Sequence, residues 1–87
     1  MLDEFNNKFV TRDGYIHLSR LETMGLEYFI NNKHKLLTQR QIASDLLHTG
    51  KIQNVRNIVF RLNKRLKNYV EIVSVRNVGY KIRYVGD

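Results

Sequence analysis

The residues of this sequence that most clearly indicate a binding function are the cations and amides between Val55 and Lys67. Arginine and lysine bind phosphates, and arginine and asparagine also form paired hydrogen bonds with base edges. No acidic residue occurs between Leu46 and Tyr69. A solvated helix face usually mixes both signs of charge, because opposite charges one turn apart stabilise it. A face of one sign therefore predicts a polyanion as partner.

The apolar residues of this stretch predict a helix with one buried side. They recur at helical intervals and cover about 100° of the circumference, at Val55, Ile58, Val59, Leu62 and Leu66. We expect Asn54 to cap a helix of roughly 20 Å from Val55 to Lys67, which fits the major groove of DNA. The exposed side and its edges then hold Arg56, Asn57, Phe60, Arg61, Lys64 and Lys67.

Phe60 is unusual on this exposed side because it is aromatic. It can contact the methyl groups of thymine in the major groove. Equally, it can fold onto the C-terminal hairpin or against a neighbouring subunit. The sequence leaves these alternatives open.

A second set of polar residues lies on a predicted hairpin near the C-terminus. Alternating residues from Ile72 to Val75 and from Tyr80 to Val85 predict its two strands. Asn77 and Gly79, between them, can take left-handed backbone angles.

The tip of this hairpin carries Arg76, which can enter the minor groove of DNA. The alternative is that Arg76 pairs with an acid and stiffens the hairpin. Ser74 and Lys81 can contact phosphates, as can Arg83 if it faces the same way. The candidate contacts of the hairpin are Ser74, Arg76, Asn77 and Lys81.

The two parts of the chain differ in charge, within a formal net charge of +7. Residues 1–34 hold four basic and five acidic side chains, and residues 35–87 hold eleven basic and three acidic ones. The first part is therefore −1 and the second +8. Such asymmetry favours phosphate neutralisation with release of counterions, and the plain alternative is that the charge only maintains solubility.

The elements that position these residues begin with a hairpin. Residues 1–8 are expected to form a frayed or loosely packed lead-in, and Phe9–Arg12 and Tyr15–Leu18 to pair across a type I′ turn at Asp13-Gly14. A capping box at Ser19-Arg20-Leu21-Glu22 predicts a helix over residues 20–31. We expect its apolar side at Leu21, Met24 and Tyr28, with Leu26, Phe29 and Ile30 as further candidates.

Two features predict how the helices pack and end. Gly25 would allow another helix to approach closely. A capping box at Thr38-Gln39-Arg40-Gln41 predicts a second helix, Gln39–Leu47, which Thr49-Gly50 ends. The order hairpin, three helices, hairpin predicts a single α+β domain over residues 1–87.

The composition excludes several kinds of site. The chain has no cysteine, and its histidines His17, His34 and His48 fall on different elements, so we expect no metal, cofactor or catalytic residues. The longest apolar run is three residues, too short for a membrane-spanning helix. No signal peptide is evident at the N-terminus. We therefore expect a cytoplasmic protein that is not an enzyme.

Four stretches together resemble the OmpR/PhoB-type effector domain, the C-terminal DNA-binding half of many bacterial response regulators. They occur in the family's order, cover roughly residues 9–85, and are Leu18-Ser19 with Glu22, Leu37–Ile42, Val55–Leu66 and Ile72–Ile82. The last stretch is the most specific, because its arginine, glycine and tyrosine stand at the family's spacing.

The resemblance implies a winged helix-turn-helix fold that binds double-stranded DNA and regulates transcription. Residues 55–67 would lie in the major groove, and residues 72–84 would form a wing in the adjacent minor groove. It further implies base or phosphate contact by Arg61, insertion of Arg76 into the minor groove and phosphate contact by Ser74. Head-to-tail homodimers on direct repeats are also implied.

The chain departs from the family's pattern in several places. It contains no receiver domain, so we expect an excised domain or a stand-alone regulator. The N-terminal sheet is reduced to about one hairpin, Leu47 replaces a common tryptophan, Thr23 and Gly25 replace larger residues, and Asn77 replaces a glycine. The loop His48–Asn54, which touches RNA polymerase in the family, is short, and this favours repression or an architectural role.

Other functions use the same residues differently. A protein-interaction module would use Phe60 and Val78 as a contact patch and the basic face to meet an acidic partner. The DNA-binding part of a replication initiator or phage regulator would bind DNA without controlling transcription in the same way.

Overall fold

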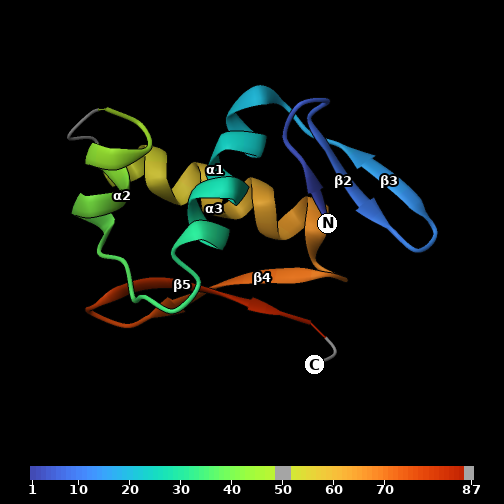
Figure 1. Ribbon diagram of the computed structural model, residues 1–87. Coiled ribbons are helices and arrows are strands. Elements are labelled where there is room, and N and C mark those ends of the chain that lie inside the picture. The colour runs from blue at the N-terminus through green and yellow to red at the C-terminus, as the bar shows by residue number, and fades with distance from the viewer. Residues whose placement is uncertain (49–51, 86–87) are drawn as a thin grey trace.

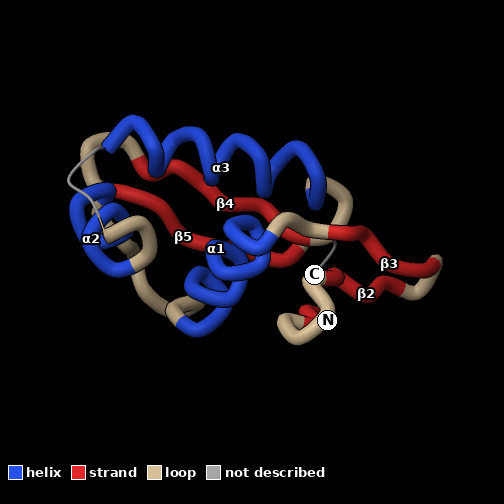
Figure 2. The backbone as a smooth tube through the Cα atoms, turned by 90° about the horizontal axis from the view of Figure 1, so that it is seen from above, coloured by secondary structure: helices blue, strands red, loops and turns tan. Residues whose placement is uncertain are grey.

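The described residues form three helices flanked by two small sheets. The computed structural model describes residues 1–48 and 52–85. Strands β1, β2 and β3 pair in that order at one end of the helices, and β4 and β5 form a separate C-terminal hairpin (Figure 1). Helix α3 packs on β4 and α1 packs on α3 (Figure 2). The elements are β1 (Leu2–Asp3), β2 (Lys8–Thr11), β3 (Gly14–His17), α1 (Arg20–Asn31), α2 (Gln39–Asp45), α3 (Ile52–Leu66), β4 (Val70–Val75) and β5 (Gly79–Tyr84).

The N-terminal segment belongs to the first sheet. Leu2 pairs with Phe9, and the amino group of Met1 donates a hydrogen bond to the carbonyl oxygen of Val10 at 2.8 Å. The expectation of a frayed or loosely packed lead-in was therefore wrong for the residues that pair with β2, Leu2 and Asp3. The physical reason is that Leu2 and Phe9 both pack in the apolar core, which ties the strand down.

The turn between β2 and β3 lies one residue earlier than predicted, so Phe9 pairs with Ile16 rather than Leu18. Thr11 pairs with Gly14, so Arg12 and Asp13 form the turn. Of these four residues only Gly14 has a positive φ, 131°, so the predicted type I′ turn was wrong. The Thr11 hydroxyl supports the turn instead, donating to the Gly14 carbonyl at 3.1 Å and accepting from the Asp13 N–H at 3.1 Å.

Helix α1 begins where predicted but buries a different side. The Ser19 hydroxyl accepts from the Glu22 N–H at 3.1 Å, and the Glu22 carboxylate accepts from the Ser19 N–H at 2.8 Å, which confirms the capping box. The expectation that Leu21 and Met24 lie on the buried side was wrong, because each is 38% exposed. Besides Glu22, the buried residues of α1 are Thr23, Gly25, Leu26 and Phe29.

Gly25 decides which side of α1 faces α3. A Cβ atom here would lie 3.2 Å from Ile58 Cγ1 and 3.5 Å from Leu62 Cδ1. The prediction that Gly25 allows a close helix approach is confirmed. The neighbouring Thr23 is buried as well, with its hydroxyl donating to the Ser19 carbonyl at 3.0 Å.

Helix α2 starts with its predicted capping box, formed by Thr38 and Gln41. It ends at Asp45 rather than Leu47. The predicted helix stop at Thr49-Gly50 lies outside the described residues.

Helix α3 is longer at its start than expected. It begins at Ile52, so Asn54 lies inside the first turn and the prediction that Asn54 caps the helix was wrong. It ends at Leu66 rather than Lys67. The predicted apolar stripe is confirmed, since these side chains are all buried: Val55, Ile58, Val59, Leu62 and Leu66. No helix in residues 1–48 or 52–85 is long and apolar enough to cross a membrane.

Asn77 and Gly79 serve the C-terminal hairpin for different reasons. Asn77 has a φ of 63°, as predicted for the tip. Gly79 has no positive φ, so the expected reason for this glycine was wrong. A Cβ atom at Gly79 would lie 1.9 Å from the carbonyl oxygen of Leu37, so the glycine permits a close approach of two backbones.

Two contacts fix the C-terminal hairpin against the helices. The Leu37 N–H donates to the Tyr80 carbonyl at 2.8 Å, and the Tyr80 N–H donates to the Leu37 carbonyl at 2.7 Å. On the other strand, the Asn63 amide of α3 donates to the Ile72 carbonyl at 3.1 Å and its oxygen accepts from the Ile72 N–H at 2.7 Å. The hairpin is therefore positioned by both α3 and the segment before α2.

We predict that Gly79→Ala lowers the free energy of unfolding by about 3 kcal/mol, because the new Cβ would break backbone hydrogen bonds between buried Leu37 and Tyr80, each worth about 1–3 kcal/mol when a buried group is left unpaired. Urea denaturation measures the change. Val78→Ala, at the exposed tip, should change it by less than about 0.5 kcal/mol. Equal stability of the two variants would contradict the prediction.

Tyr28 joins α1 to α2 through a hydrogen bond from its hydroxyl to Asp45 Oδ2 at 3.1 Å. Burial, this hydrogen bond and the charge of Asp45 raise the pKa of Tyr28 to about 12. Because the pKa is raised on folding, the stabilisation is complete below the ordinary tyrosine pKa near 10 and is lost as pH rises through about 12.

We therefore expect an ultraviolet titration of the folded chain to show a tyrosine ionisation step near pH 12 that belongs to Tyr28. Tyr28→Phe should remove this step. Persistence of the step in Tyr28→Phe, or its absence from the wild-type chain, would show that the contact with Asp45 does not hold.

Candidate nucleic-acid interface

All ten residues predicted to contact DNA are exposed. Helix α3 carries five of them, which we call the basic face: Arg56, Asn57, Phe60, Arg61 and Lys64. Lys67 follows the end of α3. The C-terminal hairpin carries the other four: Ser74 on β4, Arg76 and Asn77 at the tip, and Lys81 on β5.

A hollow between α3 and the C-terminal hairpin brings the two sets together. This hairpin groove has a volume of about 450 Å³, and Gln39, Arg56 and residues 74–80 line it. Two guanidinium groups, a serine hydroxyl and side-chain amides therefore converge on one groove. Such groups bind phosphate oxygens, arginine by charge-assisted hydrogen bonds.

A second hollow lies on the other side of the basic face. It has a volume of about 330 Å³ and is lined by Leu21, Leu47, Asn54, Asn57, Ile58 and Arg61. Asn57 and Arg61 are thus neighbours, one turn apart. Lys64, Lys67 and Lys81 line neither hollow.

Sequence reasoning missed two polar residues of these hollows. Asn54 was assigned to a cap, although its spacing of three and seven residues from Asn57 and Arg61 would have placed it on the same side of a longer helix. Gln39 donates to the Tyr80 hydroxyl at 3.3 Å. No local signal predicts this contact, because it depends on the approach of the C-terminal hairpin to the start of α2.

Two arginines near the interface are bound within the protein. Arg65 Nε lies 3.4 Å from Glu22 Oε1, and the Arg65 guanidinium also donates to the His17 carbonyl. Arg83 Nη2 lies 2.6 Å from Glu71 Oε1, so a phosphate contact by Arg83 would compete with this exposed ion pair and stays a prediction.

The cations of the basic face and the hairpin tip differ from Arg65 and Arg83 in their pairing. Among residues 1–48 and 52–85, Arg56, Arg61, Lys64 and Arg76 form no ion pair. The alternative that Arg76 pairs with an acid is therefore not what the described residues show. Within the described residues, an external anion can therefore bind these side chains without first breaking an ion pair.

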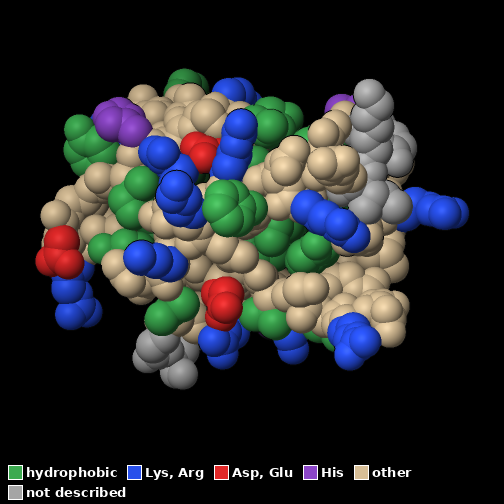
Figure 3. Space-filling view, turned by 180° about the vertical axis from the view of Figure 1, so that it is seen from behind, with side chains coloured by type: hydrophobic (Ala, Val, Ile, Leu, Met, Phe, Trp, Pro, Cys, Tyr) green, Lys and Arg blue, Asp and Glu red, His purple; other side chains and the backbone are tan. Residues whose placement is uncertain are grey.

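Figure 3 shows the side of the molecule that lies behind in Figure 1, where α3 runs. Lysine and arginine side chains spread over this side, and acidic ones are sparse. Basic side chains therefore outnumber acidic ones on the face that Figure 3 shows. A phosphate backbone would approach this side with favourable electrostatics.

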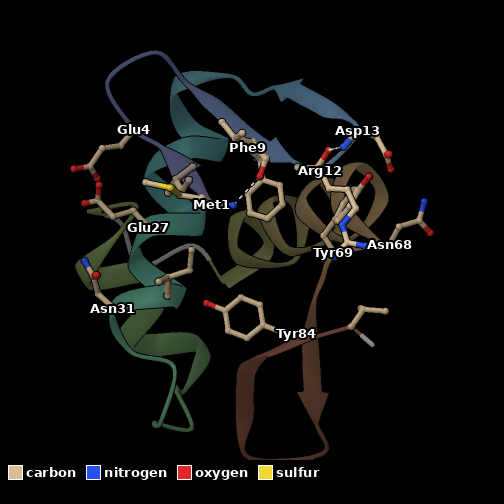
Figure 4. Close-up of a pocket in the computed structure, with 15 residues that line it drawn as sticks. Met1, Glu4, Phe9, Arg12, Asp13, Glu27, Asn31, Asn68, Tyr69 and Tyr84 are labelled. Carbon is tan, nitrogen blue, oxygen red and sulfur yellow. Dashed lines mark hydrogen bonds between the residues drawn. The ribbon is translucent and has the colours of Figure 1, made fainter. Parts of the chain in front are cut away.

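A further cavity, of about 770 Å³, lies away from the basic face between β1, β2, α1 and the end of β5. Figure 4 shows Phe9, Tyr69 and Tyr84 around it, with Glu4 and Glu27 at its edge. Its lining mixes apolar rings with Glu4, Asp13, Glu27 and Arg12, so it lacks the single sign of charge that marks the basic face.

No family model matches the chain, and no curated protein matches it by sequence. Solved structures do match. The DNA-binding domain of E. coli CadC is 17% identical, with a TM-score of 0.80 over 93% of this chain and 86% of that one. The DNA-binding domain of Bacillus subtilis CssR is 20% identical, with a TM-score of 0.82 over 95% of this chain and 98% of that one. The DNA-binding domain of the response regulator AdeR, solved in complex with an intercistronic region, is 20% identical, with a TM-score of 0.76 over 93% and 90% of the two chains.

These likenesses confirm the predicted α+β winged helix-turn-helix fold. The predicted resemblance to the OmpR/PhoB-type effector domain is confirmed for the fold. Helices α2 and α3 are the helix-turn-helix pair, and β4 and β5 are the wing.

We predict that two arginines of α3 differ in their effect on stability. Arg65→Ala should lower the free energy of unfolding by about 1–2 kcal/mol, because the buried Glu22 carboxylate loses its ion pair while it keeps the hydrogen bond from the Ser19 N–H, with a discount for the partial exposure of Arg65. Arg61→Ala should change it by less than about 0.5 kcal/mol. Thermal unfolding of both variants measures the difference, and a larger loss for Arg61→Ala would refute the assignment.

Proposed function

We propose that this chain binds double-stranded DNA sequence-specifically and regulates transcription in the cytoplasm of a bacterium. The observation that carries the proposal is the basic face, whose cations form no ion pair with described residues and which adjoins the hairpin groove. Support also comes from solved domains of the same fold that are named as DNA-binding, including one in complex with an intercistronic region.

Helix α3 would enter the major groove with its basic face toward the bases. It has 15 residues and is therefore roughly 22 Å long, which suits the groove. Arg61 can form a bidentate contact with guanine, and Asn57 can do so with adenine. Lys64 and Lys67 would reach the phosphates on either side.

The wing would lie over the adjacent minor groove. Arg76 stands exposed at its tip, beside Asn77, and would insert where the groove is narrow and its potential most negative. Arg56 and Ser74, which share the hairpin groove, would hold the phosphate strand between the two grooves. Lys81 would contact the backbone from β5.

We further propose that two copies bind head to tail on a direct repeat. The support is the resemblance of the sequence motifs and the exposed single-sided interface, which leaves room for a second copy along the DNA. Repression is the mode that we favour over direct contact with RNA polymerase, because only residues 46–51 connect α2 to α3.

We predict that Arg61→Ala and Arg76→Ala each weaken specific binding by about 1–3 kcal/mol. Binding of the wild-type chain should fall steeply with salt, and each variant that loses a phosphate contact should lower the slope of log K against log salt by about one. Selection from a random duplex pool followed by fluorescence anisotropy at several salt concentrations measures both.

Lys33→Ala is the matched control, since Lys33 is an exposed cation in the connection after α1. It should leave affinity within about twofold and the salt slope unchanged, as expected for a charge outside the contact. Failure to retain any duplex from the pool at low salt would refute the proposed function.

A further inference from the structure

Phe60 is the one apolar residue of the basic face. Its side chain is 67% exposed. Arg56 and Lys64 lie one turn before and after it on the same side of α3. In the described part of the chain, Phe60 takes part in no aromatic pair and no cation–π contact.

The position of Phe60 does not serve the packing of the chain. The ring does not line the hairpin groove, although Arg56, one turn away, does. The buried stripe of α3 is complete without it, because Val59 and Leu62 already face the core. An aromatic ring left in water at the centre of a cationic surface is stabilised only when a partner covers it.

The chemistry of the major groove leaves one partner for such a ring. The base edges there present hydrogen-bond donors and acceptors, and the single apolar group is the 5-methyl of thymine. A phenyl ring neither donates nor accepts a conventional hydrogen bond. Arg56 and Lys64, at the phosphates on either side, would hold the ring over the base edges.

We infer that Phe60 reads the 5-methyl group of thymine, and that it makes this chain distinguish thymine from uracil in its site. The inference rests on the proposed function, since it requires α3 in the major groove. Asn57 and Arg61 would form the hydrogen bonds to neighbouring bases. Phe60 is then a specificity-determining residue, and it adds no charge to the contact.

The test replaces a single methyl group. In a duplex selected by the chain, each thymine is exchanged in turn for deoxyuridine, and affinity is measured for the wild type and for Phe60→Ala. We expect one or two exchanges to weaken wild-type binding about fourfold, the factor that corresponds to ~0.8 kcal/mol for one buried methyl or methylene group. The same exchanges should leave Phe60→Ala binding unchanged, so that ring and methyl are coupled in a double-mutant cycle.

The matched control is Phe5→Ala, because Phe5 is 95% exposed on the N-terminal segment, away from α3. This variant should keep the full wild-type response to deoxyuridine. Phe60→Leu, which retains an apolar side chain, should keep part of it. Since Phe60 is exposed, its replacement should leave the thermal unfolding midpoint in place.

Three results would overturn the inference. If no exchange of thymine for deoxyuridine weakens wild-type binding, the chain contacts no thymine methyl group. If the exchange weakens binding of the wild type and of Phe60→Ala equally, a residue other than Phe60 contacts the methyl group. A change in self-association by Phe60→Ala, with no change in the response to deoxyuridine, would place the ring against a second copy. A chain that binds no duplex overturns the proposed function itself, and this inference with it.

Discussion

The arrangement of the interface depends on a pair of backbone hydrogen bonds between Leu37 and Tyr80. They draw the wing against the start of α2, and they form only because position 79 has no side chain. The hydrogen bonds between Asn63 and Ile72 fix the other strand of the wing to α3. Because the wing is held from both sides, Arg76 at its tip and Arg56 on α3 share one groove. A wing tethered only by its connection to α3 would not maintain that geometry.

The packing of the chain and the proposed DNA contact use opposite sides of α3. The apolar stripe packs against α1, α2 and β4, while the basic face stays free of ion pairs among the described residues. Arg65 marks the boundary, since its ion pair with Glu22 joins α3 to the capping box of α1. The Glu22 carboxylate is thus paired within the protein and is not part of the basic face. Repulsion among the remaining surface cations destabilises the folded chain. A bound phosphate backbone would offset this repulsion.

The sequence predicted the features that local rules determine. Capping boxes link residues three apart, and the stripe of α3 follows from helical periodicity, so both were found in the pattern itself. The buried side of α1 was not, because it depends on Gly25 admitting Ile58 from another helix. Strand β1 was missed for a similar reason, since two residues carry no periodicity and the pairing of Leu2 with Phe9 is decided by the core. Gln39 joins the interface only through the tertiary contact of the wing.

The central claim is that one side of α3 and the tip of the wing form the surface that meets DNA. It is tested most directly by following the backbone amide signals of the isotopically labelled chain while a selected duplex is added. We predict that the largest shifts fall on the basic face and on residues 74–81, and that the signals around the cavity between Phe9 and Tyr84 change little. Large shifts on strands β1 to β3 with α3 unchanged would contradict the account.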